Sequence, residues 1–378
     1  MTDISNINNC HVCGGSAPIL DAATNLCCVT SDCRPWPVKA ELAVCHTCGL
    51  TQKRITPSWS KEIDIIYGSY TMYPQAGGKE QASFQSDTGA AQARSQRIME
   101  AITSLSLLPE QGAMLDVGCG NGNMIRSFKD AYPQWALAGH EWDARHADII
   151  RAIPNVTSFF TSFPDDRIDC FDLISMVHVL EHIVDPATYL RKLTSLLRAD
   201  GLLLIEVPNL RRNPYDLAIF DHCSHFTASS LRRLLLQAGL QIKWLSEDIV
   251  SKELTVLCSV GTSEPEPVTS EELSISEECV VWLENLIERA KEINSKNSLG
   301  IFGTSIGASW IVSELGRTPD FFLDEDPNRI GKYHLNKPIL ALDETPQNAS
   351  IVIPLTTESA APVSARMSRP DLILIYPF

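Results

Sequence analysis

The sequence predicts an α/β protein with a central Rossmann-like domain, a small cysteine-rich domain before it and a second Rossmann-like α/β domain after it. Three observations support this prediction. Residues 114–123 read MLDVGCGNGN, an apolar strand that runs into a glycine-rich turn. Residues 299–307, LGIFGTSIG, repeat a strand followed by glycines. Two CxxC pairs stand within the first 48 residues, and such pairs are typical of small metal-binding domains.

Length and composition are those of an ordinary globular protein. A chain of 378 residues can hold two or three domains, each with its own core. The net charge of −15 argues against nucleic acid as a partner, because nucleic-acid-binding proteins present a basic face. The first nine residues do not form a signal peptide, and no apolar run is long enough to span a bilayer. We therefore expect a cytoplasmic protein with no membrane partner and a small or carrier-linked substrate.

The paired cysteines are the first candidate site, with expected ligands Cys10, Cys13, Cys45 and Cys48. Each pair is followed by glycine, and thiolates at this spacing can share one Zn²⁺ in a closed tetrahedral site. The metal would replace the core that a domain as short as residues 1–56 cannot build. The alternative is four reduced cysteines in a small core. Whether a cysteine between the pairs replaces a ligand stays open for Cys27, Cys28 and Cys33.

The glycine-rich turn is the second candidate site, with glycines at 118, 120 and 122. Glycine lets the backbone turn tightly and approach a ligand, and the helix that follows offers free N–H groups at its start. Asp116 precedes the turn, and Glu141 ends the apolar stretch 135–140, where a second strand should stop. A carboxylate at that point can accept hydrogen bonds from both ribose hydroxyls. The sequence therefore predicts a nucleotide-like cofactor.

This combination, LDVGCGNG followed by an acid after the second strand, resembles the class I methyltransferases that use S-adenosylmethionine (SAM). The resemblance implies that SAM occupies Gly118, Gly120 and Gly122, with Glu141 on its ribose and Asp116 close by. An NAD site is the alternative, but the GxGxxG pattern fails because position 123 is Asn.

Further elements of the central domain, residues 57–262, follow from periodicity and caps. Residues 83–107 predict an amphipathic helix, and the apolar run 169–178 predicts a strand buried on both faces. Asp185 and Pro186 begin a helix that we expect to reach Leu197, with Gly201 closing it. The last elements are expected to be a strand at 202–207, a helix at 228–238 and a hairpin of 241–247 with 253–260.

The third region, residues 263–378, begins after a linker at 261–270 that is rich in Pro, Glu, Thr and Ser. We expect a helix at 271–293 and then strands at 299–303, 321–326, 351–354 and 372–376. This alternation predicts a small parallel α/β domain. It could bind the nucleotide part of a substrate or serve as a structural lid.

A tyrosine-rich stretch precedes the central domain's first strand. Tyr67, Tyr70 and Tyr73 fit one helical face, but Pro74 and the glycines at 77 and 78 break the helix and leave Tyr73 on a loop. A packing stripe is the alternative, more for Tyr67 than for Tyr73, because loop aromatics with polar neighbours tend to lie at sites.

Two histidine motifs follow. HVLEH, residues 178–182, matches the methyltransferase family at the loop after the fourth strand; we favour His178 near the sulfonium and His182 as structural or cofactor-lining. The second motif, DHCSH at 221–225, lies in the loop before the helix at 228. For His178 and His182 the alternative is a histidine in the core, and for His222 it is a loop histidine that caps a helix.

The order of all these parts resembles the sugar C-methyltransferases that act on nucleotide-linked keto-deoxysugars. In that family a Tyr, the first His of HVLEH and a Glu-His pair surround the substrate. The resemblance implies these roles for Tyr73, His178, Asp221 and His222. Two departures concern the acceptor: Ile219 stands where the family has Tyr, and Asp221 where it has Glu.

Carbon methylation beside a ketone needs a base for the α-proton and a hydrogen-bond donor for the enolate oxygen. We expect His222 to be the base, with Asp221 orienting or assisting it and Tyr73 or His178 as the donor; His225 is a further candidate base. Two alternatives stay open: an O- or N-methyltransferase on a related sugar or small metabolite, and a zinc-bearing scaffold whose methyltransferase core is inactive.

Overall fold

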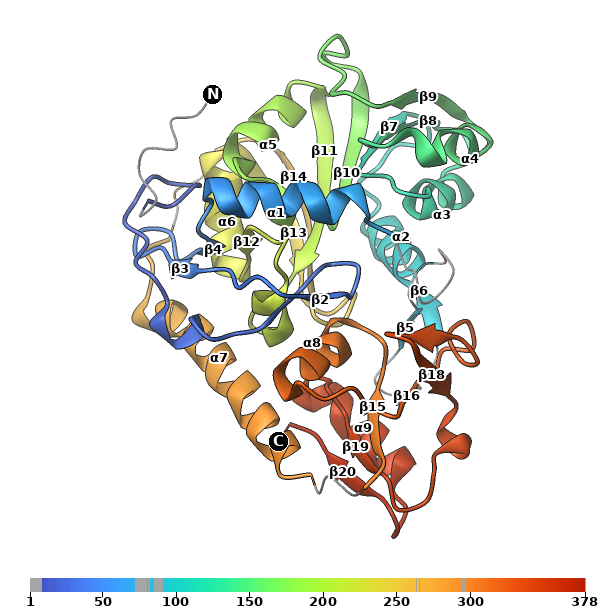
Figure 1. Cartoon of the computed structure of the whole chain (residues 1–378). Coiled ribbons are helices and arrows are strands. Elements are labelled where there is room, and N and C mark those ends of the chain that lie inside the picture. Colours follow the sequence, from blue (N-terminus) through green and yellow to red (C-terminus); the bar gives the residue numbers. More distant parts are fainter. Residues whose placement is uncertain are drawn as a thin grey trace.

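The structure is a computed structural model that describes residues 9–71, 80, 82–84, 91–262, 264, 266–293 and 297–377. The central domain surrounds a long sheet, the N-terminal segment lies against one side of this domain, and the C-terminal domain lies below it (Figure 1). No helix in these residues combines the length and the apolar character needed to cross a membrane.

The central sheet has seven strands in the order β13-β14-β11-β10-β7-β8-β9. The strands from β9 to β11 in that order are parallel, whereas β14 is antiparallel to both of its neighbours. The predicted α/β fold and its closing hairpin are confirmed. The bounds are β7 Ala113–Val117, β8 Ala136–His140, β9 Val156–Phe160, β10 Phe171–Val177, β11 Leu197–Pro208, β13 Leu240–Ser246 and β14 Glu253–Val260.

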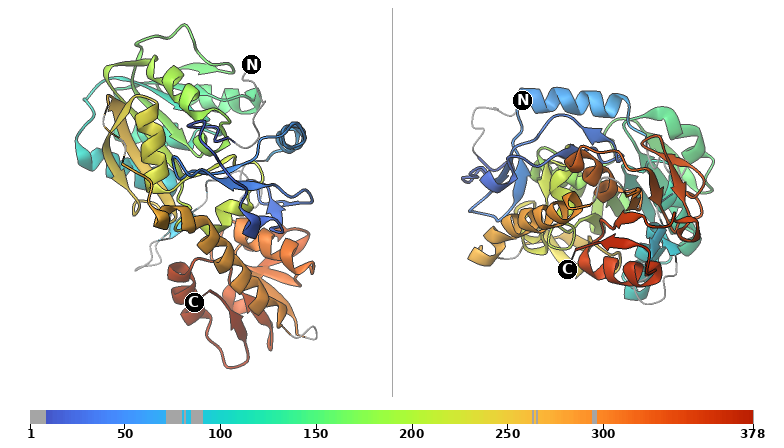
Figure 2. Two further views of the ribbon diagram at one scale, coloured as in Figure 1. Left: turned by 90° about the vertical axis from the view of Figure 1, so that its left-hand side faces the viewer. Right: turned by 60° about the horizontal axis from the view of Figure 1, so that its bottom comes forward.

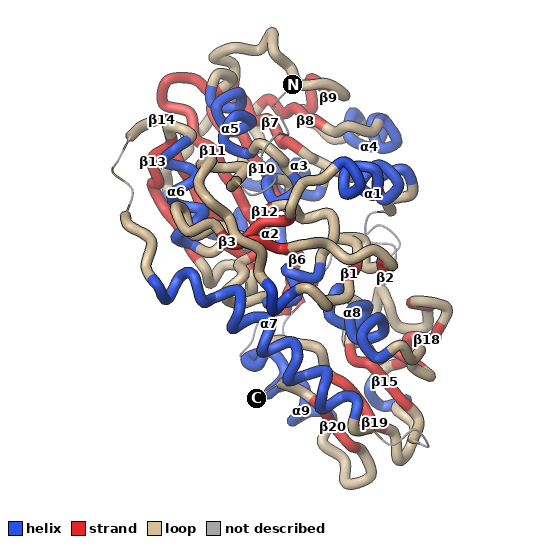
Figure 3. The backbone as a smooth tube through the Cα atoms, turned by 60° about the vertical axis from the view of Figure 1, so that its left-hand side comes forward, coloured by secondary structure: helices blue, strands red, loops and turns tan. Residues whose placement is uncertain are grey.

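Helices cover both faces of this sheet, and a separate apolar cluster lies beneath each face (Figure 3). One cluster includes Leu190 and Leu234 from α5 (Pro186–Thr194) and α6 (Ala228–Gln237). The other is built from α2 (Arg94–Leu105), α3 (Asn123–Ala131) and α4 (Ala147–Arg151). Local caps explain where two of these helices begin: the Asp185 side chain accepts a hydrogen bond from Thr188 N, and Thr227 forms a capping box with Ser230.

The predicted helix over 83–107 is wrong at its start. Two short strands, β5 (Ala82–Phe84) and β6 (Ala91–Ala93), pair antiparallel there, and α2 begins only at Arg94. The cap explains the late start, because Glu80 accepts hydrogen bonds from both the backbone N and the Oγ of Ser95, at 2.9 and 2.7 Å. The Glu80 carboxylate, fifteen positions before Ser95, provides the acceptor for a free N–H group at the start of α2. The hydrophobic periodicity of the helix contains no information about this contact.

A second boundary differs at the junction of α5 and β11. The predicted helix reaches Leu197, but α5 ends at Thr194 and Leu197 already pairs with Phe171 of β10. The register between these strands shifts after this first pair, so β11 begins with an irregular segment around Gly201 before its regular part. Gly201 therefore lies inside the strand and does not close the helix.

The N-terminal segment contributes the strands β1 (Cys28–Val29), β2 (Pro35–Trp36), β3 (Leu42–Val44) and β4 (Thr51–Lys53), and the helix α1 (Pro57–Gly68). A three-stranded sheet has the order β12-β4-β3. Its outer strand β12, Ser224–His225, comes from the loop before α6, so this sheet joins the N-terminal segment to the central domain.

The C-terminal domain has a six-stranded sheet in the order β17-β18-β16-β15-β19-β20, parallel except for β17. The predicted small parallel α/β domain is confirmed. The long helix α7 (Ser270–Lys291), capped by Thr269 and Glu272, leads into it (Figure 2). The remaining bounds are β15 Leu299–Phe302, α8 Ile306–Leu315, β16 Phe321–Leu323, β17 Tyr333–His334, β18 Lys337–Leu340, β19 Ser350–Val352, α9 Thr357–Met367 and β20 Ile373–Ile375.

Candidate cofactor and substrate site

The glycine turn after β7 needs glycine for steric reasons. Gly118 has a φ of +69°, and a Cβ at this position would lie 2.3 Å from the Cγ2 atom of Val179. Gly122, with a φ of +84°, would bring a Cβ to 2.6 Å from the Cδ1 atom of Ile150. L-residues rarely adopt such φ values, and neither contact leaves room for a side chain. The turn therefore presents bare backbone at the carboxyl end of the sheet.

Two carboxylates hold this turn and its strand. Glu141 follows β8, and its Oε2 accepts a hydrogen bond from the backbone N of Gly120 at 3.0 Å. Asp116, on β7 and only 2% exposed, accepts a hydrogen bond from the Oγ of Ser175 at 2.6 Å. Burial raises the pKa of Asp116 to about 7, although the bond from Ser175 opposes the shift. Asp116 lies on β7 and lines the cavity described next, whereas Glu141 lies directly after β8 and is not among the residues that line it.

A cavity of about 470 Å³ extends from this turn to the other two domains. The glycine turn and the loop that contains His222 line one side, and the start of α8 lines another. Ser31, Asp32 and Cys33 bring the N-terminal segment to the same space. One cavity therefore reaches the predicted cofactor turn, the predicted base and the C-terminal domain.

His222 lines this cavity, and its Nδ1 lies 2.7 Å from the Oδ1 of Asp216. Burial lowers the pKa of His222, but the charge of Asp216 and its hydrogen bond, together with Glu181 and Asp221, outweigh burial and raise that pKa above its ordinary value. Because Nδ1 is occupied, Nε2 is the ring nitrogen left for a substrate. We expected Asp221 to orient His222, but the carboxylate that contacts the His222 ring is that of Asp216.

Asp221 is held elsewhere. Its two carboxylate oxygens accept hydrogen bonds from the backbone N and the Oγ of Ser31, at 2.8 and 2.5 Å. Its backbone carbonyl lies 2.9 Å from the Nδ1 of His182, which also lies 3.0 Å from the Tyr67 hydroxyl. Asp221 therefore ties the loop to the N-terminal segment, and His182 packs edge-on against the ring of His222 with 4.6 Å between centroids.

His225 is completely buried on β12, with its Nδ1 2.7 Å from the second oxygen of Asp216. Burial is the main cause that lowers the pKa of His225 to about 4. This imidazole does not line the cavity among the described residues, so it supports Asp216 and does not face a substrate.

His178 lies in a buried charge network at the cavity. Its Nδ1 is 3.1 Å from Glu181, and its Nε2 is 3.7 Å from Glu206 and 3.6 Å from Glu253. Burial and Arg94 lower the pKa of His178, but the three carboxylates outweigh both and raise it to about 10. A ring with this pKa carries a proton at neutral pH and can donate a hydrogen bond.

The tyrosine-rich stretch is described only in part. Tyr73, the tyrosine that we expected at the substrate, lies outside the described residues. Tyr70 lines the cavity, and Tyr67 belongs to α1 and contacts His182.

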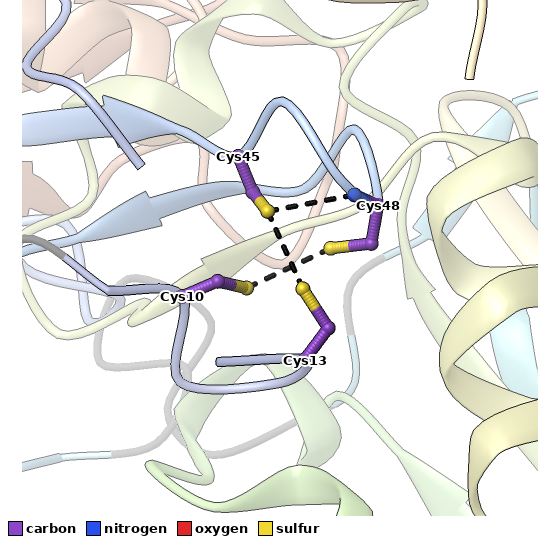
Figure 4. Close-up of side chains that lie close together, drawn as sticks. All are labelled: Cys10, Cys13, Cys45 and Cys48. Carbon is purple, nitrogen blue, oxygen red and sulfur yellow. Dashed lines mark hydrogen bonds between the residues drawn. The ribbon is translucent and has the colours of Figure 1, made fainter. Parts of the chain in front are cut away.

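The four expected metal ligands converge, with their sulfur atoms all within 4.8 Å of one another (Figure 4). Backbone N–H groups point at the sulfurs: Val12 N lies 3.4 Å from Cys10 Sγ, and Thr47 N lies 3.4 Å from Cys45 Sγ. This tetrathiol set with N–H donors fits Zn²⁺. The other three cysteines of this segment are not part of this group: Cys27, Cys28 and Cys33.

The C-terminal domain offers polar groups to the cavity at the carboxyl end of its sheet. Gly303, with a φ of +78°, and Ser305 lie before α8. Arg329, 7% exposed, donates from Nη1 to the Oγ1 of Thr304 at 3.0 Å and lies 3.4 Å from Asp324. Arg329 also lies 3.5 Å from Asp326, so two aspartates pair its charge, and the start of α8 is the feature that suits an anionic group.

Sequence reasoning missed Asp216, Ser31 and Arg329. Asp216 lies in the 3₁₀ helix Pro214–Ala218, six positions before His222, a spacing that matches no helix or strand period. Ser31 meets Asp221 across 190 positions. Arg329 follows the acids after β16, and that acidic strand end was the only sequence signal for it.

Comparison with known proteins finds methyltransferases that are similar to part of this chain. Residues 90–243 match the family model of a methyltransferase domain. C-methyltransferase NovU of Streptomyces niveus is 24% identical over 257 residues, 62% of this chain and 56% of that protein. An ubiquinone biosynthesis O-methyltransferase of Glaesserella parasuis is 28% identical over 116 residues, 28% of this chain and 49% of that protein. The chain thus spans about half the length of these curated relatives.

Two solved structures are similar over part of the chain. An S-adenosylmethionine dependent methyltransferase from Mesorhizobium loti has a TM-score of 0.34 and 17% identity, covering 42% of this chain and 97% of that one. The mitomycin 7-O-methyltransferase MmcR has a TM-score of 0.38 and 16% identity, covering 44% of this chain and 53% of that one. The strand order and the match at 90–243 identify the central part of this chain as a methyltransferase domain with the class I, Rossmann-like fold.

Proposed function

We propose that this protein transfers the methyl group of SAM to a carbon atom beside the keto group of a nucleotide-linked sugar. One observation carries the proposal: the cavity at the glycine turn also contains an imidazole, His222, whose Nδ1 is bound to a buried carboxylate. An imidazole held in this way is a suitable base for a carbon acid. The similarity to C-methyltransferase NovU supports the same chemistry.

The chain's own residues suit the cofactor. The backbone of the glycine turn would hold the methionine part of SAM. Glu141, whose Oε2 lies 3.0 Å from Gly120 N, would accept hydrogen bonds from the ribose hydroxyls. Asp116 and His178 border the same end of the cavity. When bound, SAM supplies a methyl group activated by its positive sulfur, so the protein needs only to align a nucleophile and manage a proton.

His222 would remove the proton beside the ketone through Nε2. The electron pair of the broken C–H bond then forms the enolate, whose carbon bonds to the methyl group as the methyl–sulfur bond breaks. The enolate oxygen needs a hydrogen-bond donor. Protonated His178 can be that donor, as can Tyr73, and Asp221 acts by holding the loop of His222. His225, which we expected as a further candidate base, is buried outside the cavity lining and is not proposed as the base.

The C-terminal domain would bind the nucleotide part. Its support is the group at the start of α8, where Gly303, Ser305 and Arg329 line the cavity. Ile219, buried and lining the cavity, supplies an apolar wall where related sugar C-methyltransferases have a tyrosine. An apolar wall favours a deoxygenated or methyl-bearing face of the sugar.

A second candidate is O- or N-methylation of a sugar or small metabolite. The similarity to ubiquinone biosynthesis O-methyltransferases supports it. In that reaction His222 would deprotonate a hydroxyl or amine, and no enolate would form. An inactive scaffold with a zinc-bearing segment is the third candidate, and the close packing around Gly118 and Gly122 argues against it.

Mass spectrometry of a panel of nucleotide-linked keto sugars, incubated with the protein and SAM in deuterated water, tests the proposal. Carbon methylation predicts a mass gain of one methyl group and exchange of the α-proton before methyl transfer. Methyl transfer without any α-proton exchange would favour the second candidate. If titration calorimetry detects no binding of SAM, the third candidate, an inactive scaffold, would be favoured.

We also propose one Zn²⁺ held by the four converging cysteines, in a cytoplasmic protein with no nucleic-acid or membrane partner. The tetrathiol geometry supports the metal, and the net charge of −15 supports the absence of a nucleic-acid partner. Metal analysis of the purified protein tests the zinc site. A binding measurement with duplex DNA at low salt tests the absence of a nucleic-acid partner.

A further inference from the structure

One carboxylate in the loop before α6 is shared by two imidazoles. Asp216 has no exposed surface, and its two oxygens each lie 2.7 Å from a histidine Nδ1, one of His222 and one of His225. Asp216 itself does not line the cavity among the described residues, whereas His222 does. Any effect of Asp216 on a substrate therefore passes through His222.

The backbone fixes these three side chains relative to one another. Asp216 ends a turn that starts at Asn213, because Asp216 N donates to Asn213 O, and Phe220 N donates to Val29 O at 2.8 Å. His225 lies on β12, which pairs with β4 of the N-terminal segment. Because both flanks of the loop are paired, the backbone that carries these residues is held in place, and a carboxylate that turned away would lose its hydrogen bonds with both histidines.

The contacts decide which ring nitrogen carries the proton. An ionised carboxylate only accepts hydrogen bonds, so each Nδ1 at 2.7 Å must carry hydrogen. Burial raises the pKa of Asp216, but its interactions with the two histidines, including both hydrogen bonds, outweigh burial and lower that pKa, so the carboxylate stays ionised. Neutral His222 is then the tautomer with a free lone pair on Nε2, the atom that can take a proton in the cavity.

The second imidazole completes the arrangement. Without His225, one oxygen of a buried carboxylate would lose its donor, which is costly in a dry interior. His225 is buried with no hydrogen-bond partner at Nε2 among the described residues, so it stays neutral and does not compete with His222 for the proton.

Other charged groups surround His222, but among the described residues its ring forms its hydrogen bond with Asp216. Glu181 binds His178 at 3.1 Å and Asp221 binds Ser31. His182 packs edge-on against the His222 ring, and the buried Lys53 lies close enough to Asp216 to interact with its charge. Asp216 is therefore the carboxylate in direct contact with the imidazole.

We propose that Asp216 is the positioning residue of the base: it fixes the tautomer of His222 and stabilises the imidazolium that forms when His222 takes the proton, while His225 holds Asp216 in place. This role rests on the proposed function for the identity of the proton donor. The tautomer itself does not depend on any reaction.

Nitrogen-15 NMR of histidine-labelled protein tests the tautomer without a substrate. The His222 signals are assigned by their loss in His222→Asn. Neutral His222 should carry hydrogen on Nδ1 in the unsubstituted protein and lose this preference in Asp216→Asn. A neutral His222 protonated on Nε2, or an unchanged tautomer in Asp216→Asn, would overturn the proposal even if no sugar is ever methylated.

Kinetics with the full chain tests the role. Asp216→Asn should lower α-proton exchange about 10²- to 10⁴-fold with unchanged SAM affinity, the scale of losing a general base, and should shift the pH midpoint of kcat/KM downward. Asp185→Asn, the same chemical change at a helix cap where Asn serves equally well, should have no effect. Asp216→Glu should recover part of the exchange. Exchange in Asp216→Asn within about threefold of the unsubstituted protein would refute the role, whereas absence of exchange in every form would count against the proposed function alone.

If Asp216→Asn does not fold, His225→Gln replaces it, since Gln can still donate to Asp216. It should retain the His222 tautomer and most of the exchange. Loss of both in a folded His225→Gln would show that Asp216 alone does not position the base.

Discussion

Replacing Gly118 by alanine isolates the steric requirement of the cofactor turn. Two costs add at this position. The left-handed φ of +69° is expected to cost an L-residue about 1–2 kcal/mol. The new methyl group would lie 2.3 Å from the Cγ2 of Val179, and overpacking of this kind costs about 1–3 kcal/mol. The total, about 2–5 kcal/mol, should appear in the free energy of unfolding.

The chain offers a matched control for the backbone cost. Gly239 has a φ of +81°, but a Cβ there would meet nothing within 4 Å. Gly239→Ala should therefore cost only about 1–2 kcal/mol. Adding Val179→Ala to Gly118→Ala removes the clashing methyl group, so the two changes should couple favourably in a double-mutant cycle.

Urea unfolding of the four variants measures these differences, and calorimetry with SAM measures whether the turn still binds. Gly118→Ala should weaken SAM binding and Gly239→Ala should not. Equal destabilisation by the two glycine variants would refute the steric argument, as would a Val179→Ala background in which Gly118→Ala costs as much as before.

Four further predictions follow from the site. His222→Asn should lower turnover about a hundredfold or more with intact SAM affinity; equal turnover would remove His222 as the base. Glu141→Ala should weaken SAM binding by about 1.5–3 kcal/mol in titration calorimetry; unchanged affinity would exclude it from the ribose. Because the pKa of His222 is raised above 6.5 despite burial and the base must be unprotonated, kcat/KM should rise with pH through a midpoint above 6.5; a midpoint below 6 would contradict this. Chelation of the purified protein should release one Zn²⁺ per chain and lower the melting temperature; full stability with no zinc released would count against the tetrathiol site.

The sequence was sufficient where a motif is local. The glycine turn, the strand that ends just before Glu141 and the two CxxC pairs each lie within a few positions, and backbone geometry at that range follows from residue type. The convergence of Cys10 with Cys48 needs one further assumption, a shared metal. The structure brings these sulfur atoms together as that assumption requires.

The sequence was insufficient where long-range packing decides. Glu80 caps α2 from outside the helix, so periodicity extended that helix too far. Ser31 occupies the carboxylate of Asp221, and this leaves Asp216 as the partner of His222. Two nearby aspartates of equal chemistry cannot be ranked from spacing alone, because the choice depends on a segment 190 positions away.

The pairing of β12 with β4 has a consequence for how this protein can be divided. Lys53 N donates to Cys223 O, and His11, between two of the metal ligands, lies 2.8 Å from Ser224 Oγ. The loop that contains His222 and β12 is therefore part of the interface between the N-terminal segment and the central domain. A fragment that keeps only the methyltransferase domain should still bind SAM, but its loop with His222 would lack the pairing with β4. A chimera that exchanges the metal-binding segment must also exchange the loop that pairs with it. Removal of the proposed Zn²⁺ should accordingly abolish methyl transfer at a chelator concentration that still leaves the central domain folded.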